Sequence, residues 1–348
     1  MSMRFAESLN AALARMLAAD ERVFVFGEDL SDPYGGPFKV TRGLSTQFPR
    51  QVLNTPISEA ALAGVAIGMA LRGRLPVLEI MFGDFITLCA DQLVNGAGKF
   101  PSVYNGRVEV PLVVRTPMGG RRGYGPTHSQ TLETLFLNAP GLTVVAPSLF
   151  HDPGGLLETA VLRDRTPVIF VENKTLYPEP LRLQQKGRCG NWHVIDPAGP
   201  APLYPTLCFT PVPGEKPDAT LAAYGGMVSL AAEAAWNVFM EEELLVELVV
   251  PSLVKPFPVE EVAASVRRSG RLLVAEEAPR TAGWGAELSA AVQENCFSSL
   301  CGPIHRVGGL DIPIPSATSM ERVALPSVQD VEKALYRLCG LDGKINER

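Results

Sequence analysis

The chain has 348 residues, of which 46% are hydrophobic and 20% are charged, so it can bury a sizeable core and is not globally disordered. Its length predicts two domains or one large α/β unit. The net charge of −6 argues against a nucleic-acid-binding protein that works by neutralising phosphates.

Neither a secretory signal nor a membrane span is expected. Glu7, Asn10 and Arg15 interrupt the N-terminal stretch, whose apolar residues fall near helical spacing rather than in one continuous run. The six cysteines include no C-x-x-C pair, which favours reduced thiols in a cytosolic protein. Cys189 and His193 are close in sequence, but no second ligand pair accompanies them to suggest a metal site. We therefore expect a cytoplasmic protein.

Short apolar runs alternate with helical patterns in the first half of the chain. The predicted strands are Val23–Phe26, Val52–Leu53, Val77–Ile80, Pro111–Val114, Thr143–Val145 and Val168–Val171. The predicted helices are Ser58–Leu71, Ile86–Lys99, Ser129–Leu137 and Pro153–Leu162. This alternation indicates βαβ units around a largely parallel sheet, whose strands are buried on both faces.

The composition changes from Pro197 to Pro217, where seven of 21 residues are proline, and this indicates a linker or an irregular excursion. Alternation then resumes. The predicted strands are Thr220–Ala223, Leu244–Val250, Leu272–Ala275 and Ile304–Val307, and the predicted helices lie near Ser229–Phe239, Val259–Arg268, Gly285–Asn295 and Val328–Leu338. We expect an α/β protein with two mostly parallel sheets, divided into residues 1–183, a Pro-rich linker at 184–217 and a smaller domain at 218–348.

Three motifs of common α/β enzymes are missing from the sequence. No G-x-G-x-x-G follows a predicted strand, no G-x-x-x-x-G-K-[ST] occurs, and no G-x-S-x-G occurs. Polar residues cluster instead where predicted strands end: Gly27–Asp29, Asn54–Glu59, Glu79–Phe85, Arg115–Pro117, and the loop Gly119–Gly125 that leads to His128. Because ligands bind outside the carboxyl ends of parallel strands, we expect these loops to share one rim.

Each of these segments also has a purely structural interpretation. Ser58 and Glu59 are typical of a helix start, and His128 fits a helix-start residue with a structural hydrogen bond. Glu28 and Asp29 fit a solvated loop, and the glycine-rich loop fits a flexible connection. The small residues from Ala61 to Ala70 fit close packing against a neighbouring helix or subunit. Taken one at a time, the segments leave both interpretations open.

Taken together, segments along nearly the whole chain resemble, in order, the beta subunit of the thiamine-diphosphate-dependent decarboxylating component of 2-oxo-acid dehydrogenase complexes. The matching stretches include GEDL, YGGPFKVTRGL, NTPISEAALAG, PVLEIMFGDF, RTPMGGRRGYGPTHSQ, PVIFVENKTLY, LLVAEEAPRTAGWGAEL and HRVGGLDIPIPSA. The resemblance implies a transketolase-like pyrimidine-binding domain followed by a transketolase-type C-terminal domain.

The resemblance also implies roles for individual residues. Glu59 would hydrogen-bond a ring nitrogen of the cofactor's aminopyrimidine and favour the imino tautomer, whose exocyclic nitrogen removes the thiazolium proton. Phe85 would pack on the pyrimidine, and Ile57 would lie beside the same site. His128 would face the substrate and the acyl-transfer step, where an imidazole can exchange a proton near neutral pH. The resemblance further implies a potassium ion held by backbone carbonyls near Leu112, Val161, Asp164 and Thr166.

One half of the cofactor site is missing from the sequence. The G-D-G mark of the magnesium and diphosphate site does not occur. The resemblance therefore implies a separate alpha subunit that holds magnesium, in an α2β2 heterotetramer active only when assembled. The implied reaction is decarboxylation of a 2-oxo acid, with acyl transfer to the lipoyl group of an acyltransferase.

Two departures from the family pattern keep other functions open. Val250-Pro251-Ser252-Leu253 stands where the family commonly has Asp-Leu-Arg-Thr, and the region Gln184–Pro217 is longer and richer in proline. A split transketolase-like or carboligating enzyme, an acetoin-cleaving complex and a non-catalytic scaffold paralogue are the alternatives. Retained Glu59 and His128 argue against the scaffold.

Overall fold

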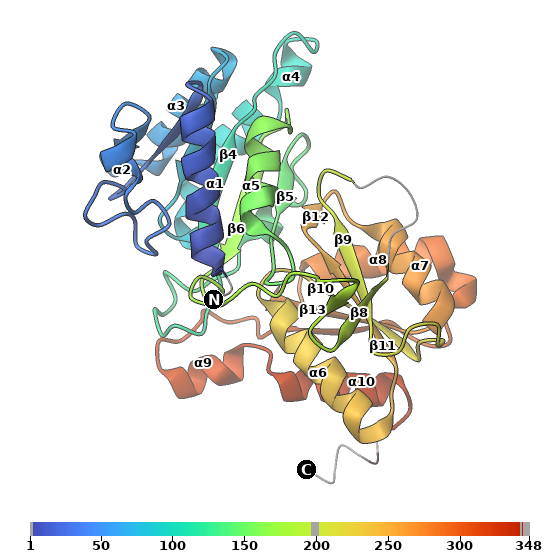
Figure 1. The fold of residues 1–348 in the computed structure, drawn as a ribbon. Helices are drawn as coiled ribbons and strands as arrows, with labels where there is room; N and C mark the ends of the chain where they lie inside the picture. Colours follow the sequence, from blue (N-terminus) through green and yellow to red (C-terminus); the bar gives the residue numbers. More distant parts are fainter. Residues whose placement is uncertain (1–2, 196–201, 342, 344–348) are drawn as a thin grey trace. The chain divides into compact units, whose positions relative to one another are not determined.

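The protein was analysed as a computed structural model that describes residues 3–195, 202–341 and 343 (Figure 1). The chain forms two compact units. The first comprises the chain up to Gly119 together with Thr127–Leu181, and the second comprises Gly120–Pro126 together with the chain from Arg182 onward. The domain boundary expected after residue 183 lies close to the observed division after Leu181. The sequence did not predict that Gly120–Pro126 belongs to the second unit.

The first unit is built on a parallel sheet of continuously buried strands. Its strand order is β5-β6-β4-β3-β1-β2, and every pairing is parallel. The strands are β1 Val23–Gly27, β2 Val52–Asn54, β3 Leu75–Glu79, β4 Val113–Met118, β5 Thr143–Val145 and β6 Val168–Asn173. All residues of β3, β4, β5 and β6 are buried, as expected for a parallel sheet covered on both faces.

Helices cover this sheet along apolar stripes. α1 (Phe5–Ala19) buries Phe5, Leu9, Leu13 and Met16 at helical spacing and packs beside α5 (Pro153–Leu162), as Figure 1 shows. The Ser8 hydroxyl of α1 donates to Asp152 Oδ1 at 2.7 Å. The other helical segments are α2 Leu44–Gln47, α3 Glu59–Leu71, η1 Gly83–Cys89, η2 Gln92–Ala97, α4 Phe100–Val103 and η3 Glu133–Phe136.

The second unit combines a parallel and an antiparallel part in one sheet. Its strand order is β14-β13-β10-β11-β9-β8-β7; the pairings from β14 to β11 are parallel and those from β11 to β7 are antiparallel. These strands are β7 Arg188–Cys189, β8 Trp192–Ile195, β9 Thr206–Thr210, β10 Ala219–Ala223, β11 Val246–Pro251, β13 Leu272–Pro279 and β14 His305–Gly309; β12 is Leu253–Lys255.

The segment expected to be a Pro-rich linker therefore contributes strands to the second sheet. β7, β8 and β9 all lie within residues 184–217, of which 196–201 are outside the described residues. Pro205 and Pro211 flank β9 and do not interrupt it. Proline lacks the N–H that a ladder needs but is tolerated at strand ends, so a proline-rich stretch still holds a short strand.

The helices of the second unit pack in pairs. α6 (Met227–Glu242) packs against α10 (Val328–Leu338), and α7 (Val259–Ser269) packs against α8 (Trp284–Cys296). α9 is Thr318–Ala324 and η4 is Phe297–Ser299. At the start of α10, the Asp330 N–H donates to Ser327 Oγ, and Asp330 accepts in turn from the Ser327 N–H. No described helix is long and apolar enough to cross a bilayer.

Most of the predicted elements are confirmed, and two helices differ. Pro153–Leu162 and Val328–Leu338 are helices with the expected bounds. Residues 86–99 form a 3₁₀ segment and a π segment instead of one α-helix, and within 129–137 only Glu133–Phe136 is helical. A Cβ at Gly98 would lie 2.6 Å from the carbonyl oxygen of Pro140, so close backbone contact shapes this part of the chain.

Candidate active site

Two buried glutamates meet where β1 ends and α3 begins. Glu28 directly follows β1, Glu59 is the first residue of α3, and both are almost fully buried. The Ser58 N–H donates to the Glu28 carboxylate, and burial together with the charge of Glu59 raises the pKa of Glu28. The solvated-loop interpretation of Glu28 is therefore wrong.

The 3₁₀ segment η1, which carries Phe85, is hydrogen-bonded to the start of α3. Cys89, the last residue of η1, donates its thiol to the carbonyl oxygen of Glu59 at 3.3 Å, which ties η1 to the start of α3. Burial, followed by the charges of Glu59 and Glu28, raises the pKa of Cys89 to about 12, so this cysteine is a thiol and not a nucleophile at neutral pH. Phe85 lies in the same segment and is half-buried.

The His128 ring completes an aromatic cluster with η1. It lies edge-on against Phe85 and Phe82, with ring centroids 5.2 Å and 4.6 Å away. Its Nδ1 is 2.8 Å from the Thr127 hydroxyl, while Nε2 has no hydrogen-bond partner among the described residues. The fully buried Lys174 donates to the carbonyl oxygen of His128 at 2.8 Å. The structure therefore fixes the backbone of His128 and leaves one ring nitrogen available.

Asp84 lies beside the same cluster. Its Oδ2 accepts from the Gln130 N–H at 3.4 Å. Burial raises the pKa of Asp84, although the charge of Lys174 opposes the shift. The residue follows Gly83 at the start of η1, so the segment that carries Phe85 also carries an acid close to Lys174 and His128.

Ile57 and the four residues expected to hold potassium do not lie in the buried site around Glu59. Ile57 precedes α3 and is 76% exposed, so the described part of the chain does not enclose it. Leu112 and Thr166 precede β4 and β6, Val161 lies in the last turn of α5, and Asp164 follows that helix. These four lie toward the amino ends of the strands, away from Glu59. The Leu112 carbonyl accepts from the Val168 N–H, and Asp164 Oδ1 accepts from the N–H and hydroxyl of Thr166.

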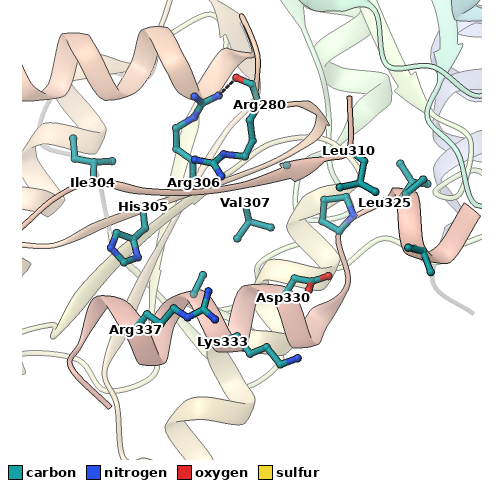
Figure 2. Close-up of a pocket in the computed structure, with 15 residues that line it drawn as sticks. Arg280, Ile304, His305, Arg306, Val307, Leu310, Leu325, Asp330, Lys333 and Arg337 are labelled. Carbon is teal, nitrogen blue, oxygen red and sulfur yellow. Dashed lines mark hydrogen bonds between the residues drawn. The ribbon is translucent and has the colours of Figure 1, made fainter. Parts of the chain in front are cut away.

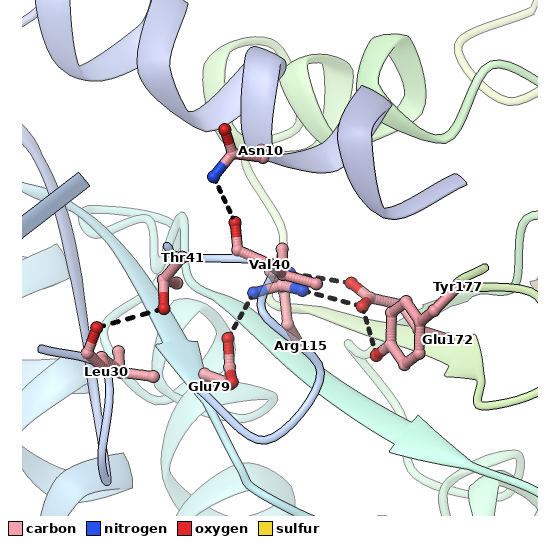
Figure 3. Close-up of polar contacts among 8 residues, drawn as sticks. All are labelled: Asn10, Leu30, Val40, Thr41, Glu79, Arg115, Glu172 and Tyr177. Carbon is pink, nitrogen blue, oxygen red and sulfur yellow. Dashed lines mark hydrogen bonds and ion pairs between the residues drawn. The ribbon is translucent and has the colours of Figure 1, made fainter. Parts of the chain in front are cut away.

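A buried ionic cluster at the ends of β3, β4 and β6 was not identified from the sequence (Figure 3). The Arg115 guanidinium donates to Glu172 through Nε and Nη2 at 2.8 and 2.7 Å, and to Glu79 through Nη1 at 2.6 Å. The Tyr177 hydroxyl donates to Glu172 Oε2 at 2.7 Å. A Cβ at Gly36 would lie 2.9 Å from Glu79 Oε1, so the loop after β1 closes over the cluster only because this residue is glycine.

Burial and the neighbouring charges shift the pKa values of Arg115, Glu79 and Tyr177 in this cluster. Burial opposes the charge on Arg115, but Glu172 and Glu79 more than offset it, so the pKa of Arg115 is raised. Burial also raises the pKa of Glu79 despite its contact with Arg115. Burial and the charge of Glu172 hold the pKa of Tyr177 well above its usual value. In the sequence, Glu79, Arg115 and Glu172 each stand at or near the end of an apolar run. This position alone does not show that the three side chains pair with one another.

Gly120–Pro126, the part of the glycine-rich loop that belongs to the second unit, is held by carboxylates of that same unit. The Gly120 N–H donates to Glu277 Oε1 at 2.7 Å. Glu321 accepts from the N–H groups of Arg121 at 2.7 Å and Gly123 at 3.1 Å. The interpretation of this loop as a merely flexible connection is therefore wrong. Glu277 and Glu321 were not singled out from the sequence, because nothing in their local pattern points to backbone groups about 150–200 residues away.

Buried oxygens on the segments that adjoin Glu28 and α3 fit an aminopyrimidine ring: Thr55 pairs with Gly27 through its backbone, and η2, which holds Gln92, packs against α3. Among the described residues, Glu28 Oε1, Thr55 Oγ1 and Gln92 Oε1 are buried side-chain oxygens without a hydrogen-bond partner. Leaving such atoms unpaired is costly, so they favour a ligand with matching polar groups. An aminopyrimidine has an amino donor, ring-nitrogen acceptors and apolar faces that suit these oxygens and the Phe85 ring. No group of three or more His, Cys, Asp or Glu in the described part of the chain is arranged for a metal ion.

Comparison with known proteins assigns the family. Residues 1–180 match the family described as transketolase, pyrimidine binding domain, and residues 210–331 match transketolase, C-terminal domain. The chain is 35% identical over 338 residues to a pyruvate dehydrogenase E1 component subunit beta-2 of Oryza sativa subsp. japonica, covering 97% of this chain and 86% of that protein. The chain belongs to the E1 beta-subunit family.

Further comparisons agree with this assignment. A pyruvate dehydrogenase E1 component subunit beta of Rickettsia bellii is 35% identical over 340 residues, which cover 97% of this chain and 99% of that protein. A split gene transketolase described as an inactive beta4 tetramer has a similar fold, with a TM-score of 0.70 and 21% identity over 98% of this chain and 99% of the other. The expected transketolase-like two-domain α/β fold is confirmed. This E1 beta family member is a 2-oxo-acid dehydrogenase beta subunit by relationship.

Proposed function

We propose that this chain is the beta half of a thiamine-diphosphate-dependent 2-oxo-acid dehydrogenase that decarboxylates a 2-oxo acid and passes the acyl group to a lipoyl arm. The observation that carries the proposal is the buried Glu28–Glu59 pair, in which Glu28 Oε1 is unpartnered and Glu59 is hydrogen-bonded through its carbonyl to the segment that carries Phe85. When bound, thiamine diphosphate supplies a thiazolium carbon that attacks the carbonyl of the oxo acid and stabilises the charge left by loss of carbon dioxide. Magnesium would accompany the diphosphate on the partner subunit, and potassium at the carbonyls named above stays a prediction.

The side chains of this chain prepare that chemistry. Glu59 holds the aminopyrimidine through a ring nitrogen and thereby favours the tautomer that can accept the thiazolium proton. Burial and the charge of Glu59 raise the pKa of the neighbouring Glu28, so a polar ligand group beside this carboxyl would relieve the cost of its burial. Phe85 packs on one face of the ring, and His128 offers its free Nε2 toward a reacting oxygen or sulfur atom.

An exposed apolar surface beside the site supports a partner subunit. Ile57, Val65 and Leu88 are all more than half exposed, although they flank the segments that carry Glu59 and Phe85. Gly64 and Gly68 lie on the same helix, and the space where each would carry a Cβ is open. Large apolar side chains next to small residues are typical of a surface that a protein partner covers. We propose that an alpha subunit covers this surface and supplies the diphosphate half of the site in an α2β2 assembly.

Glu59→Gln tests the proposal directly. The chain is assembled with its alpha partner and loaded with cofactor, and hydrogen–deuterium exchange at the thiazolium carbon is measured. Glutamine keeps the size of the side chain but cannot shift the tautomer, so exchange should slow by about 10²–10⁴-fold. Glu21→Gln, at an exposed position, is the matched control. Wild-type exchange in a loaded, assembled Glu59→Gln complex would remove Glu59 from the mechanism.

His128→Ala separates acyl handling from cofactor binding. Turnover of pyruvate with lipoamide as acceptor should fall by about 10²-fold or more, because a positioned proton donor is lost, while cofactor affinity should stay unchanged. His193→Ala, in the second sheet, is the control. If cofactor affinity collapses and turnover per bound cofactor is normal, His128 is a structural residue.

Carboligation is the second candidate function. The departure at Val250–Leu253 favours it, because the family's charged pair is absent from the end of β11 and the following residues. Products are analysed with and without lipoamide. Acyl-lipoamide formation supports the dehydrogenase, and carbon–carbon bond formation that ignores lipoamide supports the carboligase. An assembled complex that binds no cofactor would instead indicate a scaffold.

A further inference from the structure

A pocket of about 610 Å³ lies in the second unit between the edge strand β14 and helix α10 (Figure 2). Its volume is in the range of small-molecule sites. In Figure 2, His305 and Val307 point from β14 toward α10, and Asp330 and Arg337 of that helix lie opposite them. None of the residues already placed at the candidate active site lines this pocket.

The charge of the pocket is strongly positive. Arg280, His305, Arg306, Lys333 and Arg337 line it, and Asp330 is its one acidic residue. Asp330, Lys333 and Arg337 line the pocket together with Ala334. The three charged residues are three or four positions apart, so they lie on one face of α10, the face that points to β14. Nothing in the fold requires this excess of cations on one wall of a hollow.

Two charged residues of the pocket, Arg306 and Asp330, already have hydrogen-bond partners within the protein. Arg306 donates to Glu276 Oε1 at 2.8 Å and to the carbonyl oxygen of Arg280 at 2.5 Å, and Asp330 accepts from the N–H and hydroxyl of Ser327. Arg280, Lys333 and Arg337 are exposed, and none forms an ion pair with a carboxylate among the described residues. Arg280 lies with Arg306 on the face of β14 that points away from α10, so Lys333 and Arg337 are the two cations that remain together on the α10 side for an anion from outside (Figure 2).

Apolar side chains form the rest of the pocket. Val307, Leu310 and Leu325 line it together with Val323, and both Leu310 and Val323 are largely exposed. A smaller hollow of about 310 Å³ shares His305 and Arg337 with it. The pocket thus offers an apolar wall next to cations.

We propose that this pocket binds a small organic polyphosphate, a molecule with an apolar or aromatic body and at least two phosphate groups. The phosphates meet Arg337 and Lys333, because guanidinium and ammonium groups bind phosphate oxygens through charge-assisted hydrogen bonds. The body of the ligand lies against Val307 and Leu325. The inference stands apart from the proposed function, since it concerns residues of the second unit alone.

Calorimetry on the full-length chain tests this site with adenosine triphosphate as the probe. Adenosine and inorganic triphosphate are the two partial ligands. Adenosine triphosphate should bind, adenosine should bind at least tenfold more weakly, and added potassium chloride should weaken binding because part of the attraction is electrostatic. Arg337→Ala and Lys333→Ala should each weaken binding about tenfold, or about 1.4 kcal/mol.

Arg188→Ala is the matched control, because it removes an exposed arginine at β7, the opposite edge of the same sheet. It should leave the affinity unchanged, and the melting temperatures of all variants should match that of the wild type. Equal effects of Arg188→Ala and Arg337→Ala would overturn the proposal, as would undetectable binding at millimolar nucleotide. Binding of a polyglutamate peptide without binding of nucleotide would also overturn it and point to a protein partner.

Discussion

Two groups of buried glutamates lie at the carboxyl ends of neighbouring strands in the first unit, and they differ in how their charge is neutralised. Glu79 and Glu172 share Arg115, and Tyr177 donates to Glu172 as well. No ion pair joins Glu28 or Glu59 to an arginine or lysine in the part of the chain that the structure describes, and Glu28 Oε1 is unpartnered. The balanced group holds the sheet together, whereas the unbalanced group is ready to bind something else.

This contrast follows from the cost of burying charge. An ionised carboxylate in a dry site needs a cation or several donors, and a fold that leaves it without them loses stability. A protein tolerates this loss of stability where the carboxylate binds a ligand or takes part in a chemical step. Carboxyl groups with shifted pKa values are therefore common at functional sites. Three substitutions test the contrast, from the largest expected effect to the smallest.

Arg115→Met should be the most damaging change. It keeps the apolar stem but leaves Glu79 and Glu172 buried without their cation, so the free energy of unfolding should fall by about 3–5 kcal/mol. Urea denaturation measures this loss. Arg22→Met, which breaks an exposed pair with Asp20, is the control and should leave the free energy of unfolding nearly unchanged, because solvent screens this pair.

A triple variant shows whether charge or packing is responsible. Adding Glu79→Gln and Glu172→Gln to Arg115→Met removes the uncompensated charges and should recover a large part of the lost stability. If the triple variant is no more stable than Arg115→Met alone, the packing of the arginine side chain explains the loss and the charge balance does not.

Tyr177→Phe should have an intermediate effect. It deletes the hydroxyl that donates to Glu172 at 2.7 Å but keeps the ring stacked on Phe38 at 4.8 Å. A hydrogen bond to a charged group contributes about 1.5–3 kcal/mol, so unfolding should become easier by an amount near the lower end of that range. Tyr34→Phe, at an exposed tyrosine, is the control. A loss as small as that of the control would mean that Arg115 alone satisfies Glu172.

Glu28→Gln should have the smallest effect and the opposite sign. Because the pKa of Glu28 is raised on folding, the ionised carboxyl opposes folding, and stability is lost as the pH rises through the folded pKa. At pH 8 the variant without cofactor should therefore melt at a higher temperature than the wild type.

The contribution of Glu28 ionisation to the difference between Glu28→Gln and the wild type should vanish below about pH 3, where the wild-type carboxyl is protonated in both states. Differential scanning calorimetry across this range measures it, with Glu21→Gln as the exposed control. A variant less stable than the wild type at pH 8 would show that the Ser58 N–H already compensates the charge of Glu28.

The sequence alone determined the alternation of strands and helices and therefore the fold class. Apolar runs such as Thr143–Val145 and amphipathic patterns such as Val328–Leu338 become strands and helices because burial acts on local periodicity. It also placed Glu59, Phe85 and His128 on segments that follow strand ends. Of these, the structure brings Phe85 into contact with His128, and joins η1 to Glu59 through Cys89.

Only the tertiary structure decided the partners. Arg115 meets Glu172, Gly120 meets Glu277, and Lys174 meets the carbonyl of His128 across 46 to 157 residues of chain. Such pairs leave no local pattern, because a hydrogen bond depends on which strand ends the fold brings together and not on neighbours in sequence. The strands within 184–217 were missed for a related reason. The number of prolines describes only the local backbone, whereas β9 forms because its backbone pairs with that of β11 in the antiparallel part of the sheet.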